Sequence, residues 1–304
     1  MSEIYEELKD VTILCVKGHY ELLKEYLTSN FPGRPIILWT LGEFNEISLQ
    51  DNIHYISVVM LPYISGEVKK FIPGTWRYSL IISEKYSLET YGSREYANRP
   101  VHLDMASYDI PYDVPVFPKG CKVSFLNTEH LTDKNTLEYI KRKLSDKIDV
   151  YHHSLENKRI MGRGKYIPYI ITDIETAKLK RYLAVPKKYD VCVVGSYSER
   201  RIQIVNKLLS RKITVLIIGA ITKCGGEMYG DERDAHIGEA RILLNIHLRK
   251  CWTVYESIRC ERWRAAGMPI VSERCEGSDA PPAVIQCSYN DIVSTVAREL
   301  AKLK

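Results

Sequence analysis

The chain has 304 residues, a length that suits two domains of about 150 residues each. With 45% hydrophobic and 27% charged residues and no apolar run long enough to cross a bilayer, it is expected to be soluble, without a membrane span. Its net charge of +5 is too small to indicate nucleic-acid binding, although it suits a phosphate-bearing ligand.

The cysteines and the N-terminus indicate a compartment. The eight cysteines form no C-x-x-C pair, and several lie inside apolar runs, so we expect reduced core residues and no zinc site. The acidic N-terminus lacks the basic flank and apolar run of a secretory signal. A cytoplasmic protein is therefore expected.

The first half of the chain reads as alternating strands and helices. An apolar run at 11–18 precedes an amphipathic helix at 19–30 and two further apolar runs at 34–41 and 54–61. Residues 61–120 lose this pattern and become rich in Pro, Gly and Tyr, which predicts a loop-rich excursion that offers a binding surface. Strands and helices then resume at 121–130, 133–147, 148–154, from Ser154, 166–171 and 175–185.

The second half alternates more regularly. Strands are predicted at 189–195, 212–219, 241–247, 268–273 and 283–288, with helices between them and a last helix at 290–304. Strands that alternate with helices indicate a parallel sheet with right-handed crossovers. We expect an α/β protein with two Rossmann-like domains that face each other across a cleft. The boundaries are 1–185, 186–290 and a closing helix, 291–304, that can pack back on the first domain.

Ligands of such folds bind at the carboxyl ends of the strands, so polar groups in the loops after the strands are the candidate ligand contacts. Gly195 and Ser196 follow a strand and precede a helix that carries Arg200 and Arg201. Backbone N–H groups, the helix dipole and guanidinium groups there suit a diphosphate, although an ordinary turn with a Ser196-x-x-Glu199 cap explains the same residues.

Further polar residues follow the next strands. Asn245 and His247 end one strand on the expected ligand side. In the helix that follows, Glu256 and Arg259 share a face, with Arg262 on its flank. They could hold ribose hydroxyls and phosphate oxygens, or form a capping box from Thr253 and an internal ion pair.

The first domain offers candidates for proton transfer. His19 follows the first strand and begins a helix that faces the expected cleft, where a histidine can remove a proton from an acceptor hydroxyl. The later loops at 127–132 and 151–157 supply further candidates, namely Glu129, His130, His152, His153 and Glu156.

Several chemistries lack their motifs. The chain has no G-x-x-x-x-G-K-[ST], no G-x-G-x-x-G after a strand and no G-x-S-x-G. It also lacks the D-x-D pair that clamps a metal and a nucleotide in single-domain glycosyltransferases. We therefore expect a metal-independent reaction and no cofactor.

The second half resembles the nucleotide-sugar domain of GT-B glycosyltransferases, and more narrowly that of viral and bacterial glycosyltransferase-like proteins. The resemblance rests on "YDVCVVGS" (189–196), "DERD" (231–234), "ILLNIH" (242–247) and the pattern "YESIRC-RW-AGM-IVSE" (255–273), and it extends over about residues 122–274.

The resemblance implies a nucleoside-diphosphate sugar, held mainly by the second domain, and a glycan or glycoconjugate acceptor. Glu256 would face the ribose, and Arg259 and Arg262 would support the leaving group. The full set of donor-binding candidates is Gly195, Ser196, Arg200, Arg201, Asp231, Arg233, Asn245, His247, Tyr255, Glu256, Arg259 and Arg262. His19 and Glu129 are the catalytic candidates, since some inverting relatives carry a histidine just after the first strand.

One departure from the family pattern leaves the stereochemistry open. Many GT-B enzymes carry a Glu-x7-Glu pair, but position 264 here is Arg264, and the second glutamate is Glu261. Two alternatives to a glycosyltransferase also remain open at this point. One is a nucleotide-sugar-binding module without activity, and the other is a sugar-nucleotide epimerase of the same fold.

Overall fold

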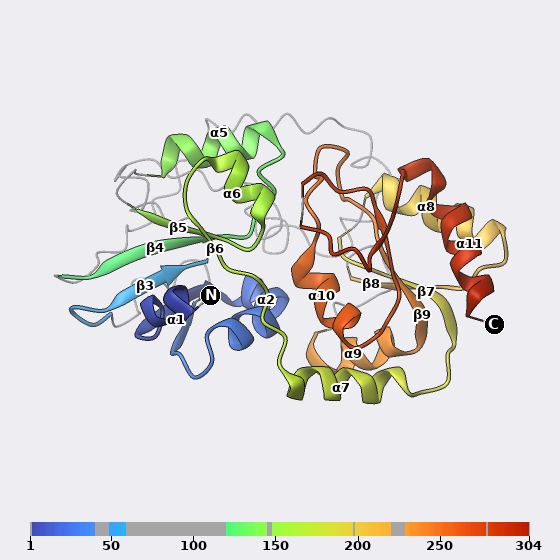
Figure 1. The fold of residues 1–304 in the computed structure, drawn as a ribbon, viewed down its shortest axis with the longest axis horizontal. Coiled ribbons are helices and arrows are strands. Elements are labelled where there is room, and N and C mark those ends of the chain that lie inside the picture. The colour runs from blue at the N-terminus through green and yellow to red at the C-terminus, as the bar shows by residue number, and fades with distance from the viewer. Residues whose placement is uncertain are drawn as a thin grey trace, which may run out of the picture.

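The computed structural model describes residues 2–39, 49–58, 120–144, 148–196, 198–219, 229–277 and 279–303. Within these ranges the chain forms two parallel sheets, each flanked by helices, which lie side by side in Figure 1. The α/β class and the two Rossmann-like sheets are therefore confirmed. The predicted excursion at 61–120 lies outside the described residues except for Gly120, and so does most of the Gly-rich loop at 220–230.

The first sheet has the order β2-β1-β3-β4-β5-β6. Its strands are β1 (Val11–Val16), β2 (Ile36–Trp39), β3 (His54–Ser57), β4 (Lys122–Asn127), β5 (Asp149–His152) and β6 (Lys165–Tyr166). Its helices are α1 (Ser2–Glu7), α2 (Lys17–Asn30), α5 (Lys134–Lys143) and α6 (Leu155–Met161). Helix α1 was not predicted, because six residues are too few to show the helical spacing of apolar side chains.

The predicted strand at 166–171 was wrong beyond Tyr166. Pro168 cannot donate to a strand ladder, and its carbonyl accepts instead from Asn30 Nδ2 at 2.5 Å. The Ile170 N–H donates to Asn30 Oδ1 at 3.0 Å. The end of α2 thus replaces a neighbouring strand as the partner of this backbone.

The second sheet has the order β11-β10-β9-β7-β8. Its strands are β7 (Tyr189–Val194), β8 (Val215–Ile218), β9 (Ala240–Asn245), β10 (Ile270–Glu273) and β11 (Ile285–Cys287). The helices of this part are α7 (Asp173–Leu183), α8 (Glu199–Ser210), α9 (Gly230–Gly238), α10 (Ser257–Ala265) and α11 (Ile292–Lys302), the last preceded by the short helix η4 (Tyr289–Asp291).

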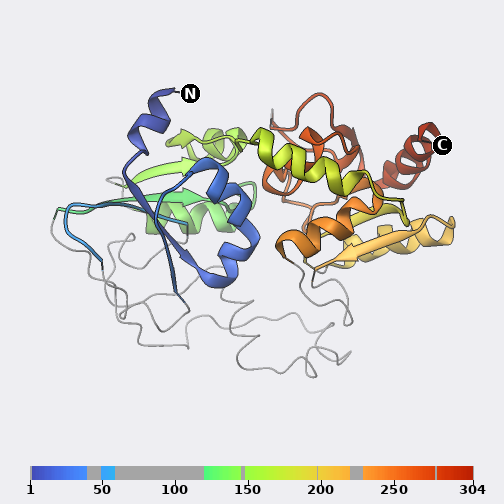
Figure 2. The same cartoon turned by 90° about the horizontal axis from the view of Figure 1, so that it is seen from below.

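Alternation along β7 builds two apolar layers on this sheet. Val191 and Val193 pack on one face with α8 and α11, whereas Cys192 packs on the other with α10 and with Leu179 of α7. Helix α7 therefore shares the core of the second sheet although it precedes the expected junction at 185. Figure 2 shows α7 leading from the first sheet along the helices of the second.

The closing helix does not fold back on the first domain. Helix α11 buries Ile292, Val293, Val296 and Leu300 in the core of the second sheet. It lies beside α8 at the edge of the molecule farthest from the first sheet (Figure 1). Its apolar face is fully used there, which explains why that expectation was wrong.

None of the helices in the described parts of the chain is long and apolar enough to cross a membrane. The same residues contain no group of three or more His, Cys, Asp or Glu side chains arranged to hold a metal ion.

Candidate functional site

The loops that follow the strands of the two sheets meet each other. Thr132 follows β4, and its Oγ1 accepts a hydrogen bond at 3.2 Å from the N–H of Thr253, which follows β9. Ser154 follows β5, and its hydroxyl donates at 2.5 Å to Asp279, which follows β10. Figure 1 shows α10 on the side of the second sheet that faces the first. The structure thus brings the carboxyl ends of both sheets together.

Glu256 lies at the start of α10 and holds two arginines. Its Oε2 is 2.5 Å from Arg259 Nη2, and its Oε1 is 3.5 Å from Arg201 Nη2. The capping box expected from Thr253 is not formed, because α10 begins only at Ser257 and Glu256 itself occupies the N-cap position without a side-chain cap. We call Arg201 and Arg259 the arginine pair, and Glu256 is the carboxylate that they share.

Arg201 is fixed inside the protein with only 1% of its surface exposed. Its Nε donates to the carbonyl of Ile246 at 2.9 Å, and its Nη1 donates to the carbonyl of Ser196 at 2.8 Å. The cap of α8 is Ser198, whose hydroxyl accepts from the Arg201 N–H at 3.2 Å, and not the expected Ser196. The guanidinium therefore lies directly beneath the turn that follows β7.

Gly195 in this turn leaves room for both arginines. Its φ of 132° favours glycine, and a Cβ built there would lie 2.7 Å from Arg201 Nη1 and 3.0 Å from Arg259 Nη2. Two guanidinium groups thus lie together at the end of β7, as an anion site requires.

The charges of this cluster do not balance. Burial would raise the pKa of Glu256, but Arg259 and Arg201 outweigh it and hold the pKa at about 2. Burial lowers the pKa of Arg201 to about 10, and repulsion from Arg259 adds to this effect. Two guanidinium groups share one carboxylate, which leaves one positive charge for a ligand.

Asn245 and His247 lie beside the arginine pair. Asn245 Oδ1 accepts from Arg259 Nη1 at 3.4 Å, and its Nδ2 donates to Ser272 Oγ at 3.0 Å. His247 is 1% exposed and its Nε2 is 3.2 Å from the carbonyl of Arg274, whereas its Nδ1 has no partner among the described residues. An Nε2–H donor leaves Nδ1 as a free acceptor.

Arg200 lies next to this group and is paired with Glu273. Its Nη2 is 2.5 Å from Glu273 Oε1, and its guanidinium lies 4.1 Å from the ring centroid of Tyr289. Glu273 also accepts from the His247 N–H at 3.2 Å. Arg200 therefore acts on the site through Glu273 and not as a free cation.

The first domain contributes histidines to the same space. The His130 ring stacks on Trp252 with centroids 4.6 Å apart, and burial lowers its pKa to about 4. His153 is buried with Nδ1 3.1 Å from the carbonyl of Asn127. Glu129 is half-buried, and burial raises its pKa although Arg249 opposes this. His19 lies in the first turn of α2 directly after β1, while its side chain lies outside the described residues.

Four predicted donor-binding residues lie elsewhere. Arg262 makes two bonds of 2.9 and 2.8 Å to Asp234, which is fully buried, and one of 2.8 Å to Glu175. Arg233 bonds to Glu25 of α2 at 2.8 Å. The other two are Asp231, which pairs with Lys178, and Tyr255, whose hydroxyl donates to Glu261 at 3.0 Å within the core.

The ion pairs of Arg262, Arg233 and Asp231 form a network among α2, α7, α9 and α10, with partners other than those of the arginine pair. The carboxylates of Asp234, Glu175 and Glu25 surround Arg262, so its charge is already compensated. The sequence could not distinguish it from Arg259, because the carboxylates that bind it are distant in the chain. Structure therefore gives Arg262 a role in joining helices.

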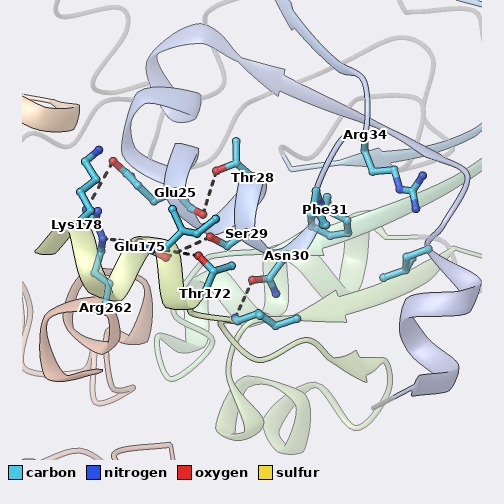
Figure 3. A pocket seen from close by; sticks show the side chains of 14 residues that line it. Glu25, Thr28, Ser29, Asn30, Phe31, Arg34, Thr172, Glu175, Lys178 and Arg262 are labelled. Atoms are coloured by element: carbon cyan, nitrogen blue, oxygen red, sulfur yellow. Dashed lines mark hydrogen bonds and ion pairs between the residues drawn. The ribbon is translucent and has the colours of Figure 1, made fainter. Parts of the chain in front are cut away.

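A cavity of about 670 Å³ adjoins this network between α2 and α7. Figure 3 shows Ser29 and Arg262 directed toward Glu175 along its wall. Asn30 on the same wall uses its amide to bind the backbone at Pro168 and Ile170. Because these polar groups are paired with one another, we interpret the cavity as a packing gap between helices and not as a ligand site.

Sequence reasoning missed Trp252, Ser257 and Cys275. The Sγ of Cys275 lies 3.8 Å from His247 Nε2, and Ser257 Oγ is buried without a partner among the described residues. Trp252 could have been recognised, because a tryptophan in a loop directly after a strand usually packs on another surface.

The fold and this site define a class: an α/β protein whose two parallel sheets meet at their carboxyl ends around a buried arginine pair. No protein-family model matches the chain. It is 33% identical over 217 residues to the uncharacterized protein L140 of Acanthamoeba polyphaga mimivirus, which covers 69% of this chain and 68% of that protein. The chain therefore belongs to the same family as L140.

Two other mimivirus proteins are similar over a comparable part of the chain. Uncharacterized protein L138 is 34% identical over 215 residues, and uncharacterized protein L137 is 31% identical over 198 residues. The aligned parts make up 23% of L138 and 26% of L137, so this chain spans about a quarter of the length of each.

Proposed function

We propose that this protein is a GT-B glycosyltransferase that moves a sugar from a nucleoside diphosphate to a hydroxyl group of a glycan or glycoconjugate. One observation carries the proposal: Arg201 and Arg259 share the single carboxylate of Glu256 beside the Gly195 turn. This excess charge lies where open α/β folds bind ligands, and α10, which carries Arg259, lies on the side of the second sheet that faces the first (Figure 1).

The arginine pair suits a departing diphosphate. In a low-dielectric site, fixed guanidinium groups stabilise charge that develops on the leaving group without reorganising at the moment of reaction. Removal of one such donor typically costs a factor of about 10² to 10³ in rate. Glu256 keeps the two guanidinium groups aligned, and a carboxylate has further lone pairs with which to accept ribose hydroxyls.

Binding should be tested first. Thermal-shift measurements should use UDP, GDP, UDP-glucose, UDP-N-acetylglucosamine and GDP-mannose. We expect the nucleotides of one nucleobase, uracil or guanine, to stabilise the protein, because a ligand at 100 times its Kd raises the free energy of unfolding by about 2.7 kcal/mol. Arg259→Ala should weaken that binding at least tenfold, since a hydrogen bond to a charged group contributes about 1.5–3 kcal/mol.

The matched control is Arg264→Ala. Arg264 lies on the same helix but pairs with Glu261 at 2.9 Å, away from the cluster. Its removal changes the net charge equally and should leave nucleotide affinity within about twofold. Absence of stabilisation by every nucleotide, or equal losses in both variants, would contradict the proposal.

Turnover then separates the alternatives. Release of nucleoside diphosphate from a sugar donor, in the presence of water or a sugar acceptor, supports a transferase. Binding without any release supports a module that holds nucleotide sugars without acting on them. Formation of an isomeric nucleotide sugar in the absence of an acceptor supports an epimerase.

A further inference from the structure

Buried polar atoms without partners gather at the junction of the two domains. The described residues contain five such side-chain atoms, and four of them belong to His130, His247, Thr253 and Ser257. All four residues lie in the loops after β4 and β9 or at the start of α10. Because an unpaired buried polar group costs free energy, such a concentration indicates a place reserved for a ligand.

His130 is the one of these residues that the first domain contributes. The backbone on both sides of it is fixed by two buried asparagines. Asn157 Nδ2 donates to the Glu129 carbonyl at 2.7 Å, and Asn157 Oδ1 accepts from the Leu131 N–H at 3.0 Å. Asn127 Oδ1 accepts from the Glu129 N–H at 3.2 Å.

The His130 ring is held as firmly as its backbone. It lies within 10° of parallel to the Trp252 ring of the second domain. Trp252 is itself held by a bond of 3.4 Å from its Nε1 to Asp133 of the first domain. The imidazole orientation is therefore set before any ligand binds.

A nearby histidine shows what a purely structural arrangement looks like. His152 has a partner at each ring nitrogen, with Nδ1 3.3 Å from Asn127 Nδ2 and Nε2 3.1 Å from the Arg163 carbonyl. His130 Nδ1 is as well shielded from solvent yet has no partner among the described residues. A histidine with an unpaired, shielded ring nitrogen, such as His130, destabilises the fold relative to a fully paired one, so stability alone does not explain it.

The charge state of His130 suits a proton acceptor. Burial lowers its pKa to about 4, so the ring is neutral at pH 7. Glu256 acts in the opposite direction and favours the protonated ring, whereas His153, His247 and Arg259 disfavour it. A neutral imidazole can take up a proton, and the charge of Glu256 favours the imidazolium ion that forms.

We propose that His130 is the catalytic base of this protein and removes the proton from the acceptor hydroxyl. The inference rests on the proposed transferase function. In this step the acceptor O–H bond breaks and its proton passes to the imidazole. The oxygen bonds to the anomeric carbon, whose bond to phosphate breaks, and the electron pair leaves on the nucleoside diphosphate beside Arg201 and Arg259. Such direct displacement inverts the anomeric carbon.

The test compares His130→Ala, His130→Gln and His19→Ala with the wild type, with His236→Ala as control. His236 lies on α9, 3.6 Å from Glu239 and outside the site. The measurements are nucleoside-diphosphate release from whichever of the sugar donors above stabilises the wild type, and thermal-shift affinity for that donor. His130→Gln retains much of the side-chain volume, so it gives a folded variant if the alanine variant is unstable.

Loss of the base should lower kcat by about 10² to 10⁴. Donor affinity should stay within about threefold, and added imidazole should restore part of the activity of His130→Ala. The acid-side fall of the wild-type rate should be absent from His130→Gln. His236→Ala should match the wild type throughout.

Each contrary result has a distinct meaning. If the wild type binds no nucleotide, the proposed function fails and this inference fails with it. If the wild type turns over and the His130 variants match it, or if only His19→Ala is impaired, the function stands and the inference is overturned. Weakened donor binding without imidazole rescue would also overturn it, since His130 would then hold the donor.

Discussion

Glu256 illustrates how much a single side chain does in this protein. Its carboxylate touches an arginine from α8 and one from α10, so it links the turn after β7 to the start of α10. Taken in sequence alone, the same residue suits a helix cap. Its tertiary partners give it instead the task of holding two like charges together.

Glu256→Gln should therefore destabilise the protein by about 3 kcal/mol, because removing one partner from a buried pair leaves uncompensated charge. Urea denaturation would measure the change. Glu232→Gln, an exposed acid in the first turn of α9, should stay within about 0.5 kcal/mol of wild type. Equal effects of the two substitutions would show that the arginines do not depend on Glu256.

At the scale of elements, two short segments position the site: the β7–α8 turn and helix α10. The turn brings backbone against Arg201, while α10 carries Arg259 toward Asn245 and this turn, and Arg262 toward α2, α7 and α9. Two neighbouring arginines of one nine-residue helix thus serve two separate purposes.

Gly195→Ala should reduce both stability and nucleotide binding. A residue with a side chain at positive φ costs about 1–3 kcal/mol, and here the new Cβ would also press on Arg201 and Arg259. Gly267→Ala is the matched control, because φ is 99° there and nothing lies within 4 Å of the added Cβ. It should lose stability, measured by denaturation, but keep its nucleotide thermal shift. Retained binding in Gly195→Ala would contradict the assignment of the turn to the site.

Arg262→Ala should separate the helix-joining network from the site. Asp234 would be left buried without its main partner, so the free energy of unfolding should fall by about 3–5 kcal/mol. Nucleotide affinity of the folded fraction, measured below the unfolding transition, should change less than in Arg259→Ala. The reverse order of effects would return Arg262 to the donor site.

At the scale of the whole molecule, the two sheets are joined by buried polar groups as well as by packing. Buried and half-buried histidines stand out among these groups. Burial lowers the pKa of His130 and of His152 to about 4, and it lowers that of His153. All three lie in or after β4 and β5, where the first domain meets the second.

Stability should fall as the pH drops below the usual pKa of histidine. Between pH 6.5 and 4 these histidines bind protons in the unfolded chain but stay neutral in the folded one. The free energy of unfolding therefore falls by up to about 1.4 kcal/mol per pH unit for each histidine. Glu256 loses its charge only as the pH falls toward 2. His152→Gln should lower stability at pH 7 yet flatten the decline in denaturation midpoint from pH 7 to 5. His236→Gln should leave the slope unchanged; an unaltered slope in His152→Gln would refute this account.

The order of strands and helices could be predicted because it depends on local periodicity. The end of β7 with its glycine, the end of β9 with Asn245 and His247, and the charged helix α10 were all recognised from the sequence. The partners of the charged residues were not. Arg233 bonds to Glu25, which is 208 positions away, and Arg262 bonds to Glu175, which is 87 away.

The sequence by itself determined the α/β class, the alternation of elements and which loops would meet at the strand ends. These follow from spacing of apolar residues over a few turns or strand residues. Only the tertiary structure decided that Arg201 and Arg259 share Glu256, that Arg262 belongs to another network, and that the Nδ1 of His130 is shielded from solvent without a partner among the described residues. The physical reason is that burial and charge compensation depend on distances between residues far apart in the chain, and only the folded arrangement sets those distances.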